Sequence, residues 1–360
     1  MFVVTNRQVS NRKGLGQFGK KPNEKGPHEI RLFDVQRSGR RWEVELLDDV
    51  LHHNTVRALI DKHGLEIDQG AKRYASLKVA CDIAEQARCD KKNIVIYVHG
   101  YNNDMDDVLR SAQAIAETHG VIVVPFSWPA NGGGAVSGTL SYKADKRDAR
   151  ASVGAFDRML MKSVEYLNLI SEGRRRRLWL EASKRHKHNQ QERDALYAKL
   201  LDRECPFTVN LMLHSMGNYL YKQLLKSTAS EATTLLFDNV ILAAADVNNA
   251  DHAAWLDRIR CRKRVYVAIN ENDFALRASR AKAGEAQLAR LGHVTYGLHA
   301  EKAVYVDFTD AKAVGSSHGY FIGEPVQRNT AVKHFFRDAL NGARAERMLD
   351  YDAEKNVYRL

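Results

Sequence analysis

The sequence is poor in cysteine and proline, and it has no long apolar run. Its 360 residues include 4 Cys and 6 Pro, and no two cysteines have C-x-x-C spacing. This scarcity argues against a zinc ribbon, a disulfide framework and a Pro-rich linker, and it favours a reducing compartment. No stretch reaches the roughly 18 apolar residues that span a membrane, and the first residues lack the apolar core of a signal peptide. We therefore expect a cytoplasmic protein without a transmembrane segment.

The sequence does contain enough apolar material for a large core. Hydrophobic residues make up 44% of the chain and charged residues 28%, a balance typical of globular proteins. Short apolar runs alternate with amphipathic helical patterns, which predicts an α/β fold with a mostly parallel central sheet flanked by helices. The predicted strands of this sheet are residues 93–98, 121–126, 208–213, 240–245, 264–269 and 303–308. Shorter strands at 2–5, 28–33 and 42–47 are predicted to form an antiparallel edge.

Composition and pattern divide the chain into three segments. Residues 1–50 are expected to form a basic N-terminal arm together with the edge strands of the sheet. Residues 51–345 form the main α/β domain, which contains a charged helical insertion at about 171–204. Residues 346–360 are expected to be a C-terminal tail.

The net charge of +11 is concentrated in two segments. Residues 1–41 contain ten Lys or Arg against three acids, and residues 172–204 contain ten against six. The remaining body is therefore neutral, whereas a nucleic-acid-binding protein carries its positive charge on the folded face that reads the polymer. The second segment includes four consecutive arginines, Arg174 to Arg177, whose guanidinium groups suit phosphates. We interpret most of this charge as a solubilising feature and predict no nucleic-acid partner.

The strongest local signal for chemistry is a serine placed between an apolar strand and a helix. The sequence LMLHSMGN at 211–218 ends a predicted strand, and helix-forming residues follow it. This order is typical of a nucleophile elbow, a sharp turn that lifts the Ser215 hydroxyl above the carboxyl edge of the sheet. The backbone N–H of Met216 would then face the developing oxyanion. Leu213 departs from the small residue that such a turn prefers, and the alternative interpretation is a serine that only caps the helix.

A nucleophilic serine needs a histidine as its base and an acid that orients the histidine. In enzymes built on this turn, the acid and then the histidine follow the serine along the chain. Asp273 and His318 each follow a predicted strand, and His318 lies in a Gly- and Ser-rich loop. Asp246 also directly follows a strand and is an alternative acid. The order predicts Ser215, His318 and Asp273 as a triad and leaves the choice between Asp273 and Asp246 open.

A second oxyanion donor is expected in the loop that follows the strand at 93–98. Gly100 in this loop lets the backbone approach a substrate closely, and the N–H of Tyr101 would complete the pair with Met216. His99 precedes the nucleophile and belongs to this donor loop, so we assign it a structural role.

Two other patterns lack the context that their usual function requires. The segment GLGQFG at 14–19 matches the dinucleotide-binding pattern, but it does not link a strand directly to a helix. His186 and His188 are two residues apart, so a helix would point them in different directions, and no carboxylate completes a metal site. We therefore expect no cofactor and no metal ion.

Several segments together resemble the α/β-hydrolase superfamily, and more closely a bacterial hydrolase-like branch catalogued as a domain of unknown function. The motifs are HGYNN at 99–103, FSWP at 126–129, Tyr142 with Asp145, HSMGN at 214–218, AADV at 244–247, ND at 272–273 with AL at 275–276, and SHGY at 317–320. The resemblance covers about residues 90–340. It implies the α/β-hydrolase fold, Ser215 as nucleophile, His318 as base, Asp273 as orienting acid, and neither a metal nor an organic cofactor.

These observations predict a serine hydrolase that cleaves an ester or related acyl bond of a small-molecule or lipid substrate. The insertion at about 171–204 is a candidate lid, with Leu178, Trp179 and Leu180 as its apolar face. The alternative is a non-catalytic module with the hydrolase fold, which binds an anionic partner through the basic arm and the arginine cluster. Leu213 and the charge of the arm are the features that favour this alternative.

Overall fold

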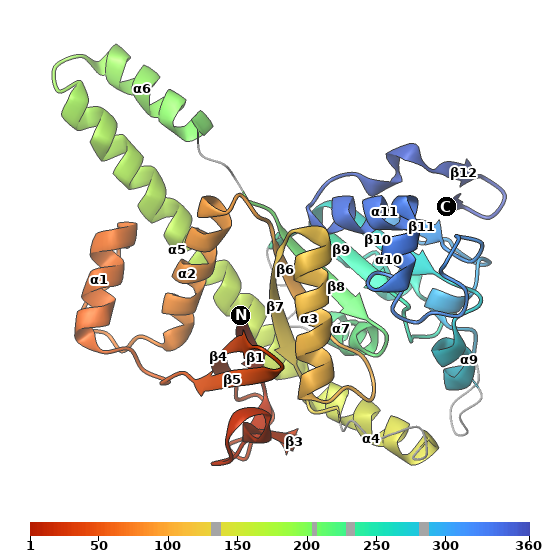
Figure 1. The fold of residues 1–360 in the computed structure, drawn as a ribbon. Helices are drawn as coiled ribbons and strands as arrows, with labels where there is room; N and C mark the ends of the chain where they lie inside the picture. The colour runs from red at the N-terminus through yellow and green to blue at the C-terminus, as the bar shows by residue number, and fades with distance from the viewer. Residues whose placement is uncertain (131–137, 204–206, 228–234, 281–287) are drawn as a thin grey trace.

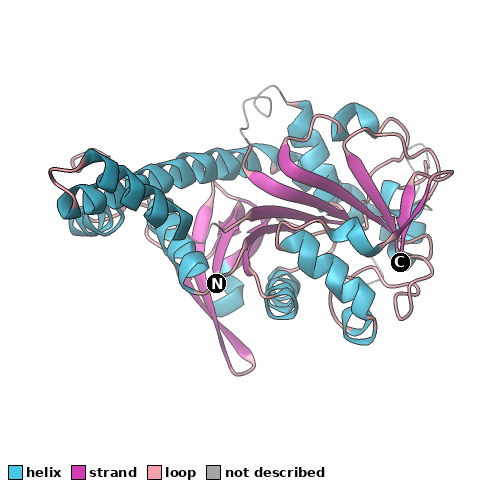
Figure 2. Cartoon of the chain, turned by 90° about the horizontal axis from the view of Figure 1, so that it is seen from above, coloured by secondary structure: helices cyan, strands magenta, loops and turns pink. Residues whose placement is uncertain are grey.

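A single eleven-stranded sheet runs through the described residues, with helices packed on both of its faces (Figure 1 and Figure 2). The structure is a computed structural model that describes residues 1–130, 138–203, 207–227, 235–280 and 288–360. The strand order is β12-β13-β11-β10-β9-β8-β6-β7-β1-β4-β5. Neighbouring strands from β13 to β1 are parallel, whereas the pairs at the two ends of the sheet are antiparallel. The predicted α/β architecture with a mostly parallel sheet is confirmed.

The central strands are β6 (Ile94–Val98), β7 (Ile122–Ser127), β8 (Val209–His214), β9 (Phe237–Ala243), β10 (Cys261–Ile269) and β11 (Ala303–Asp307). Each overlaps a predicted strand. Alternate side chains of a strand face opposite sides of the sheet. In β6, Ile94 and Ile96 belong to the apolar core on one face, while Val95 and Tyr97 belong to the core on the other. Burial on both faces explains why these strands are continuous apolar runs in the sequence.

Helices cover both faces of this sheet. One face is covered by α2 (Ala75–Cys89), α5 (Val153–Arg185), α7 (Gly217–Lys226) and α8 (Ala253–Leu256), and the other by α3 (Met105–His119), α10 (Glu324–Arg328) and α11 (Thr330–Leu340). The remaining α-helices are α1 (His53–His63), α4 (Gly138–Ala151), α6 (Gln190–Arg203) and α9 (Phe274–Arg280). In α3, a capping box with Asp104 starts the helix, and Gly120 ends it with a φ of 67° in the left-handed region.

The N-terminal segment, expected to form a basic arm and edge strands, contributes three strands to the main sheet. β1 (Phe2–Thr5) pairs in parallel with β7 and antiparallel with β4 (Arg31–Ser38), and β5 (Arg41–Leu46) closes this edge. β2 (Arg7–Val9) and β3 (Phe18–Pro22) form a separate two-stranded sheet. The antiparallel edge is therefore present as predicted. The first strand, β1, also extends the parallel part of the sheet, and its Val3 and Val4 side chains are buried.

Residues 346–360, expected to be a C-terminal tail, contribute two short strands to the main sheet. β13 (Val357–Arg359) pairs in parallel with β11, and β12 (Asp350–Asp352) pairs antiparallel with β13. Glu346 is buried, and it accepts a 2.6 Å hydrogen bond from Tyr266 OH. These strands are only three residues long, DYD and VYR, so they are too short for an apolar pattern that sequence analysis could detect.

The charged insertion is the outer part of a helical hairpin. α5 is 33 residues long, and it runs from before the predicted insertion into it without a break. It projects away from the sheet, and α6 returns beside it (Figure 1). Even α5, the longest described helix, is too polar to cross a membrane, and no other described helix is both long and apolar enough.

Candidate active site

Ser215 occupies a sharp turn between β8 and α7. Its φ is 52°, in the left-handed region that non-glycine residues rarely adopt. The Ser215 N–H donates a 3.0 Å hydrogen bond to the carbonyl oxygen of Ala243, at the end of the neighbouring strand β9. The side-chain amide of Asn218 donates to the Ser215 carbonyl oxygen at 3.0 Å. A strand, a sharp turn at the serine and a helix therefore follow one another here, which is the backbone arrangement of a nucleophile elbow.

Two glycines make room for this turn. A Cβ on Gly217 would lie 2.7 Å from the carbonyl oxygen of Val98, and a Cβ on Gly100 would lie 2.6 Å from the Cβ of Ser215. The loop that follows β6 therefore passes directly beside the serine. Leu213, which departs from the small residue expected before the turn, is fully buried in the apolar core on the α7 side of the sheet. The turn accommodates this leucine.

His318 and Asp273 are in direct contact. The Nδ1 atom of His318 lies 2.7 Å from Oδ2 of Asp273, whose side chain is fully buried. The other oxygen, Oδ1, accepts hydrogen bonds from the N–H groups of Ala275 and Leu276 at 2.9 and 3.0 Å. Asp273 thus caps the first turn of α9 with one oxygen and orients the imidazole with the other.

The imidazole of His318 lies next to the residue that precedes Ser215. The rings of His214 and His318 have centroids 4.6 Å apart, and His214 Nε2 lies 3.1 Å from the carbonyl oxygen of His318. The hydrogen bonds of these described residues include none between Ser215 Oγ and the His318 ring. In enzymes of this kind the bond between nucleophile and base often tightens only when substrate is bound.

Asp246, the alternative acid, belongs to a different buried group. Its carboxylate contacts Ser279 Oγ at 2.5 Å, Tyr142 OH at 3.0 Å and Arg290 Nε at 3.1 Å. Its backbone N–H donates to the Ser215 carbonyl oxygen at 3.2 Å, so it supports the elbow from the side of the main chain. Of the two described candidates, the structure brings Asp273 and not Asp246 to the histidine.

The two predicted oxyanion donors, Met216 and Tyr101, belong to segments that adjoin the serine. Met216 is buried at the N-terminus of α7. Tyr101 follows Gly100, and its ring packs edge-on against Tyr142 of α4 with centroids 5.5 Å apart. The next residue, Asn102, has a φ of 59°, and its N–H donates to Asp145 Oδ2 at 3.0 Å. The loop beside the elbow is therefore held in a fixed, partly left-handed conformation.

Comparison with known families matches this geometry. Residues 78–170 and 183–326 match the model of a family described as alpha/beta hydrolase of unknown function (DUF900). The chain belongs to this family. No curated protein and no solved structure matches it. The matched ranges contain Ser215, Asp273 and His318, whereas they omit residues 171–182 of α5.

Arg7 is a residue of this α/β hydrolase that sequence reasoning missed, because we counted it as part of a solubilising arm. It is 2% exposed. Its guanidinium donates to Ser127 Oγ at 2.9 Å, to the Ala130 carbonyl at 3.0 Å and to the Asn103 carbonyl at 3.1 Å. Burial lowers its pKa to about 10. Arg7 thus ties together the loops after β6 and β7 at the edge where Ser215 lies, and no local signal in the sequence indicates this.

His99 of the α/β hydrolase is a buried structural residue, as assigned from its position. Its Nδ1 lies 2.9 Å from the Gly100 carbonyl oxygen, and its Nε2 accepts a 3.2 Å hydrogen bond from the Trp128 N–H. The ring also stacks on the indole of Trp128 with centroids 5.0 Å apart. A nitrogen that accepts an N–H cannot carry a proton, so this ring must stay neutral. Burial lowers the pKa of His99 to about 3.

This buried imidazole predicts that the α/β hydrolase loses stability in acid. Below its ordinary pKa of about 6.5, the unfolded chain protonates His99, whereas the folded chain does not until about pH 3. Its contribution is therefore complete above pH ~6.5 and falls by up to about 1.4 kcal/mol per pH unit below it. Urea unfolding at about pH 7, 6 and 5 measures this slope. The His99→Gln variant should have a shallower slope, and equal slopes in both proteins would contradict the assignment.

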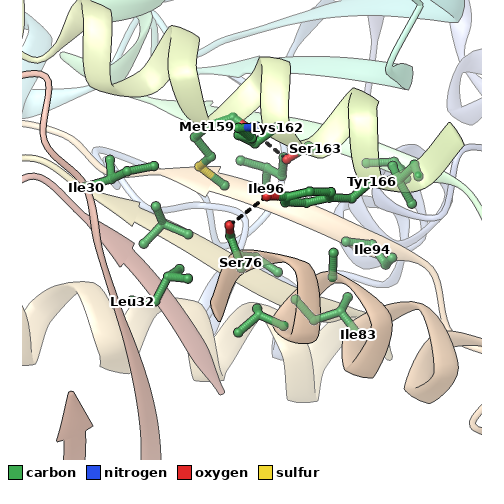
Figure 3. Close-up of a pocket in the computed structure, with 16 residues that line it drawn as sticks. Ile30, Leu32, Ser76, Ile83, Ile94, Ile96, Met159, Lys162, Ser163 and Tyr166 are labelled. Carbon is green, nitrogen blue, oxygen red and sulfur yellow. Dashed lines mark hydrogen bonds between the residues drawn. The ribbon is translucent and has the colours of Figure 1, made fainter. Parts of the chain in front are cut away.

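The apolar cavity in Figure 3 does not belong to the elbow of the α/β hydrolase. Its volume is about 100 Å³, and it lies between α2, α5 and the sheet, beside Ile94 and Val209 at the amino ends of β6 and β8. A 3.0 Å hydrogen bond between Ser76 Oγ and Tyr166 OH crosses it. Ser215 follows the carboxyl end of β8. The cavity is therefore not a pocket for a substrate of Ser215.

The α5–α6 hairpin also lies away from Ser215. A second cavity between α5 and the sheet is lined by Val209, Asp238 and Arg262, which stand at the amino ends of β8, β9 and β10. Because β8 has six residues, its two ends are about 20 Å apart. The insertion does not cover the elbow, and the expectation of a lid has no support in this arrangement.

Proposed function

We propose that this α/β hydrolase cleaves ester or related acyl bonds, with Ser215 as nucleophile, His318 as base and Asp273 as orienting acid. The observation that carries the proposal is the 2.7 Å contact between His318 Nδ1 and Asp273 Oδ2 at the sheet edge where Ser215 occupies the elbow. The pair of His318 and Asp273 supplies the base and the orienting acid that a serine nucleophile requires.

In the proposed reaction, Ser215 Oγ attacks the substrate carbonyl carbon while His318 Nε2 takes the hydroxyl proton. Asp273 holds the proton on Nδ1, so that Nε2 is free to accept, and it stabilises the imidazolium that forms. The N–H groups of Met216 and Tyr101 hold the negative oxygen of the tetrahedral intermediate, each contributing on the order of 3 kcal/mol to the lowering of the barrier. The leaving alcohol takes the proton from His318. Water, deprotonated by the same histidine, then attacks the acyl carbon, and the bond to Ser215 Oγ breaks as that oxygen takes the proton back from His318.

The surroundings of the histidine favour a substrate with an apolar part. Phe274, the first residue of α9, is 62% exposed, and its ring centroid lies 6.5 Å from that of His318. We infer that Phe274 contacts the apolar part of the substrate, because small-molecule sites are lined mostly by hydrophobic and aromatic side chains. We therefore infer a small-molecule or lipid ester as the substrate class.

Covalent labelling tests the nucleophile. A fluorophosphonate should modify the purified protein once, and mass spectrometry of peptides should place the adduct on Ser215. Short-chain p-nitrophenyl esters should be hydrolysed by the same preparation. The matched control is Ser227, a serine just after α7, which should stay unmodified, and the Ser215→Ala variant should take up no label. A folded protein with neither adduct nor turnover would contradict the proposal.

A further inference from the structure

Asn270 lies at the carboxyl end of β10, directly after Ile269, and it is fully buried. Its amide nitrogen donates hydrogen bonds to two carbonyl oxygens in the loop that carries His318, to Gly315 at 2.9 Å and to Ser317 at 3.1 Å. These two acceptors belong to the residues three and one positions before His318. The amide therefore holds the main chain of this loop directly before the proposed base.

The oxygen of the same amide holds the turn that contains the acid. Oδ1 of Asn270 accepts a 3.0 Å hydrogen bond from the Asn272 N–H, and the carbonyl oxygen of Asn270 accepts a 3.1 Å hydrogen bond from the Asp273 N–H. The N–H of Asn270 donates to the Gly292 carbonyl oxygen at 3.0 Å. One buried residue thus binds both the turn of the acid and the loop of the base.

A carboxamide supplies the combination of hydrogen-bonding groups that this position uses. Its nitrogen has two donors, which match the two carbonyl oxygens of the base loop, and its oxygen is an acceptor, which matches the N–H of the acid turn. An aspartate has the same shape but no donor when it is ionised, and a serine has a single donor on a shorter side chain. The two segments that Asn270 joins therefore explain why an asparagine follows β10.

The loop of the base depends on such contacts for its position. Residues 308–323, all of which the structure describes, form no α-helix or strand between β11 and α10. Ala313 has a φ of 68°, in the left-handed region that surrounding contacts must hold for a non-glycine residue. The side chain of His318 is 18% exposed, whereas that of Asp273 is fully buried. Burial fixes the acid, while the contacts of the loop fix the base.

We propose that Asn270 is a positioning residue, which holds His318 at the correct distance from Asp273 by joining their two loops. This role rests on the proposed function, in which the two side chains are base and acid. Their 2.7 Å contact requires both loops to keep their places, and a displacement of about 1 Å between catalytic groups lowers a rate on the order of a hundredfold. The side-chain hydrogen bonds of Asn270 described above reach main-chain atoms, so it acts through the loops.

A matched control lies at the opposite end of the sheet. Asn239, near the amino end of β9, is also fully buried. Its amide nitrogen donates at 2.9 Å to the carbonyl oxygens of both Ala339 and Ala343, and its Oδ1 accepts a 3.2 Å hydrogen bond from the Arg264 N–H. Asn239→Ala therefore removes the same kinds of side-chain hydrogen bond as Asn270→Ala, at the edge away from the proposed active site.

Steady-state kinetics with a p-nitrophenyl ester test the proposal. Asn270→Ala should lower kcat on the order of a hundredfold while KM stays within about twofold, because the groups that contact the substrate are unchanged. Asn239→Ala should keep kcat within about twofold of the wild type, although urea unfolding should show a loss of stability in both variants. Equal losses of kcat in the two variants, or a wild-type kcat in Asn270→Ala, would overturn the assignment.

Proton NMR separates this role from ester hydrolysis, because it needs no turnover. The imidazole proton between His318 Nδ1 and Asp273 should give a far-downfield resonance, which the His318→Gln variant assigns by its loss. The resonance should persist in Asn239→Ala and be broadened or lost in Asn270→Ala, even if the wild type hydrolyses no ester. If Asn270→Ala does not fold, Asn270→Ser replaces it, since a hydroxyl and a water molecule can satisfy the loop carbonyls without fixing them. An unchanged resonance in the folded variant would show that Asn270 does not position the base.

Discussion

Replacing Asp273 with asparagine is expected to lower kcat for ester hydrolysis by about four orders of magnitude while the protein stays folded. Asparagine keeps an oxygen that can accept the N–H groups of Ala275 and Leu276, so it still caps α9. Its amide, however, presents N–H donors to His318 Nδ1. The imidazole would then carry its proton on Nε2, the nitrogen that must accept the proton of Ser215. Steady-state kinetics with a p-nitrophenyl ester and urea unfolding measure the two effects separately.

The matched control for this variant is Asp246→Asn, which should show the opposite pattern. Its carboxylate is paired with the buried Arg290 and does not contact His318. Removing the charge leaves a buried cation without its partner, which costs about 3 kcal/mol or more in the free energy of unfolding. The folded fraction should keep a kcat close to that of the wild type. If Asp246→Asn lost activity and Asp273→Asn kept it, the acid would be assigned to the wrong residue.

The parts of this molecule that sequence could predict depend on local pattern. The central strands are apolar runs buried on both faces, and their predicted bounds lie within a few residues of the observed bounds. Ser215, Asp273 and His318 each follow a strand of the predicted parallel set, which predicted that they would reach one edge, since parallel strands share their carboxyl edge. The choice between Asp273 and Asp246 depended on where two loops fold, so the sequence left it open.

The parts that sequence missed depend on contacts between distant segments. Arg7 has the same local pattern as a solvated arginine, yet it is buried and tied to loops about 100 residues further along the chain. The strands β12 and β13 have three residues each, and they form because β11 offers an open edge. The insertion has the composition of a lid, but its position depends on the direction of α5, which composition does not encode.

Gly292 packs against the backbone of a segment that is distant in the sequence, so we expect Gly292→Ala to lower the free energy of unfolding by at least about 3 kcal/mol. A Cβ at this position would lie 2.2 Å from the Ala245 nitrogen and 2.6 Å from the Ala244 carbonyl carbon. Both atoms are backbone, so no side chain can move aside. The segment is also fixed there by hydrogen bonds, from the Gly292 N–H to the Ala245 carbonyl at 3.1 Å and from the Asn270 N–H to the Gly292 carbonyl at 3.0 Å.

Gly319→Ala is the control for this substitution, because a Cβ on Gly319 meets no atom within 4 Å and the residue lies in the loop of His318 at the same edge of the sheet. Its free energy of unfolding should stay within about 1 kcal/mol of the wild type, since alanine also restricts the unfolded chain. Urea unfolding of both variants makes the comparison. Equal stability of the two would mean that residues 288–293 do not pass against Ala244 and Ala245. The buried group of Asp246 and Arg290, which this passage encloses, would then need a different explanation.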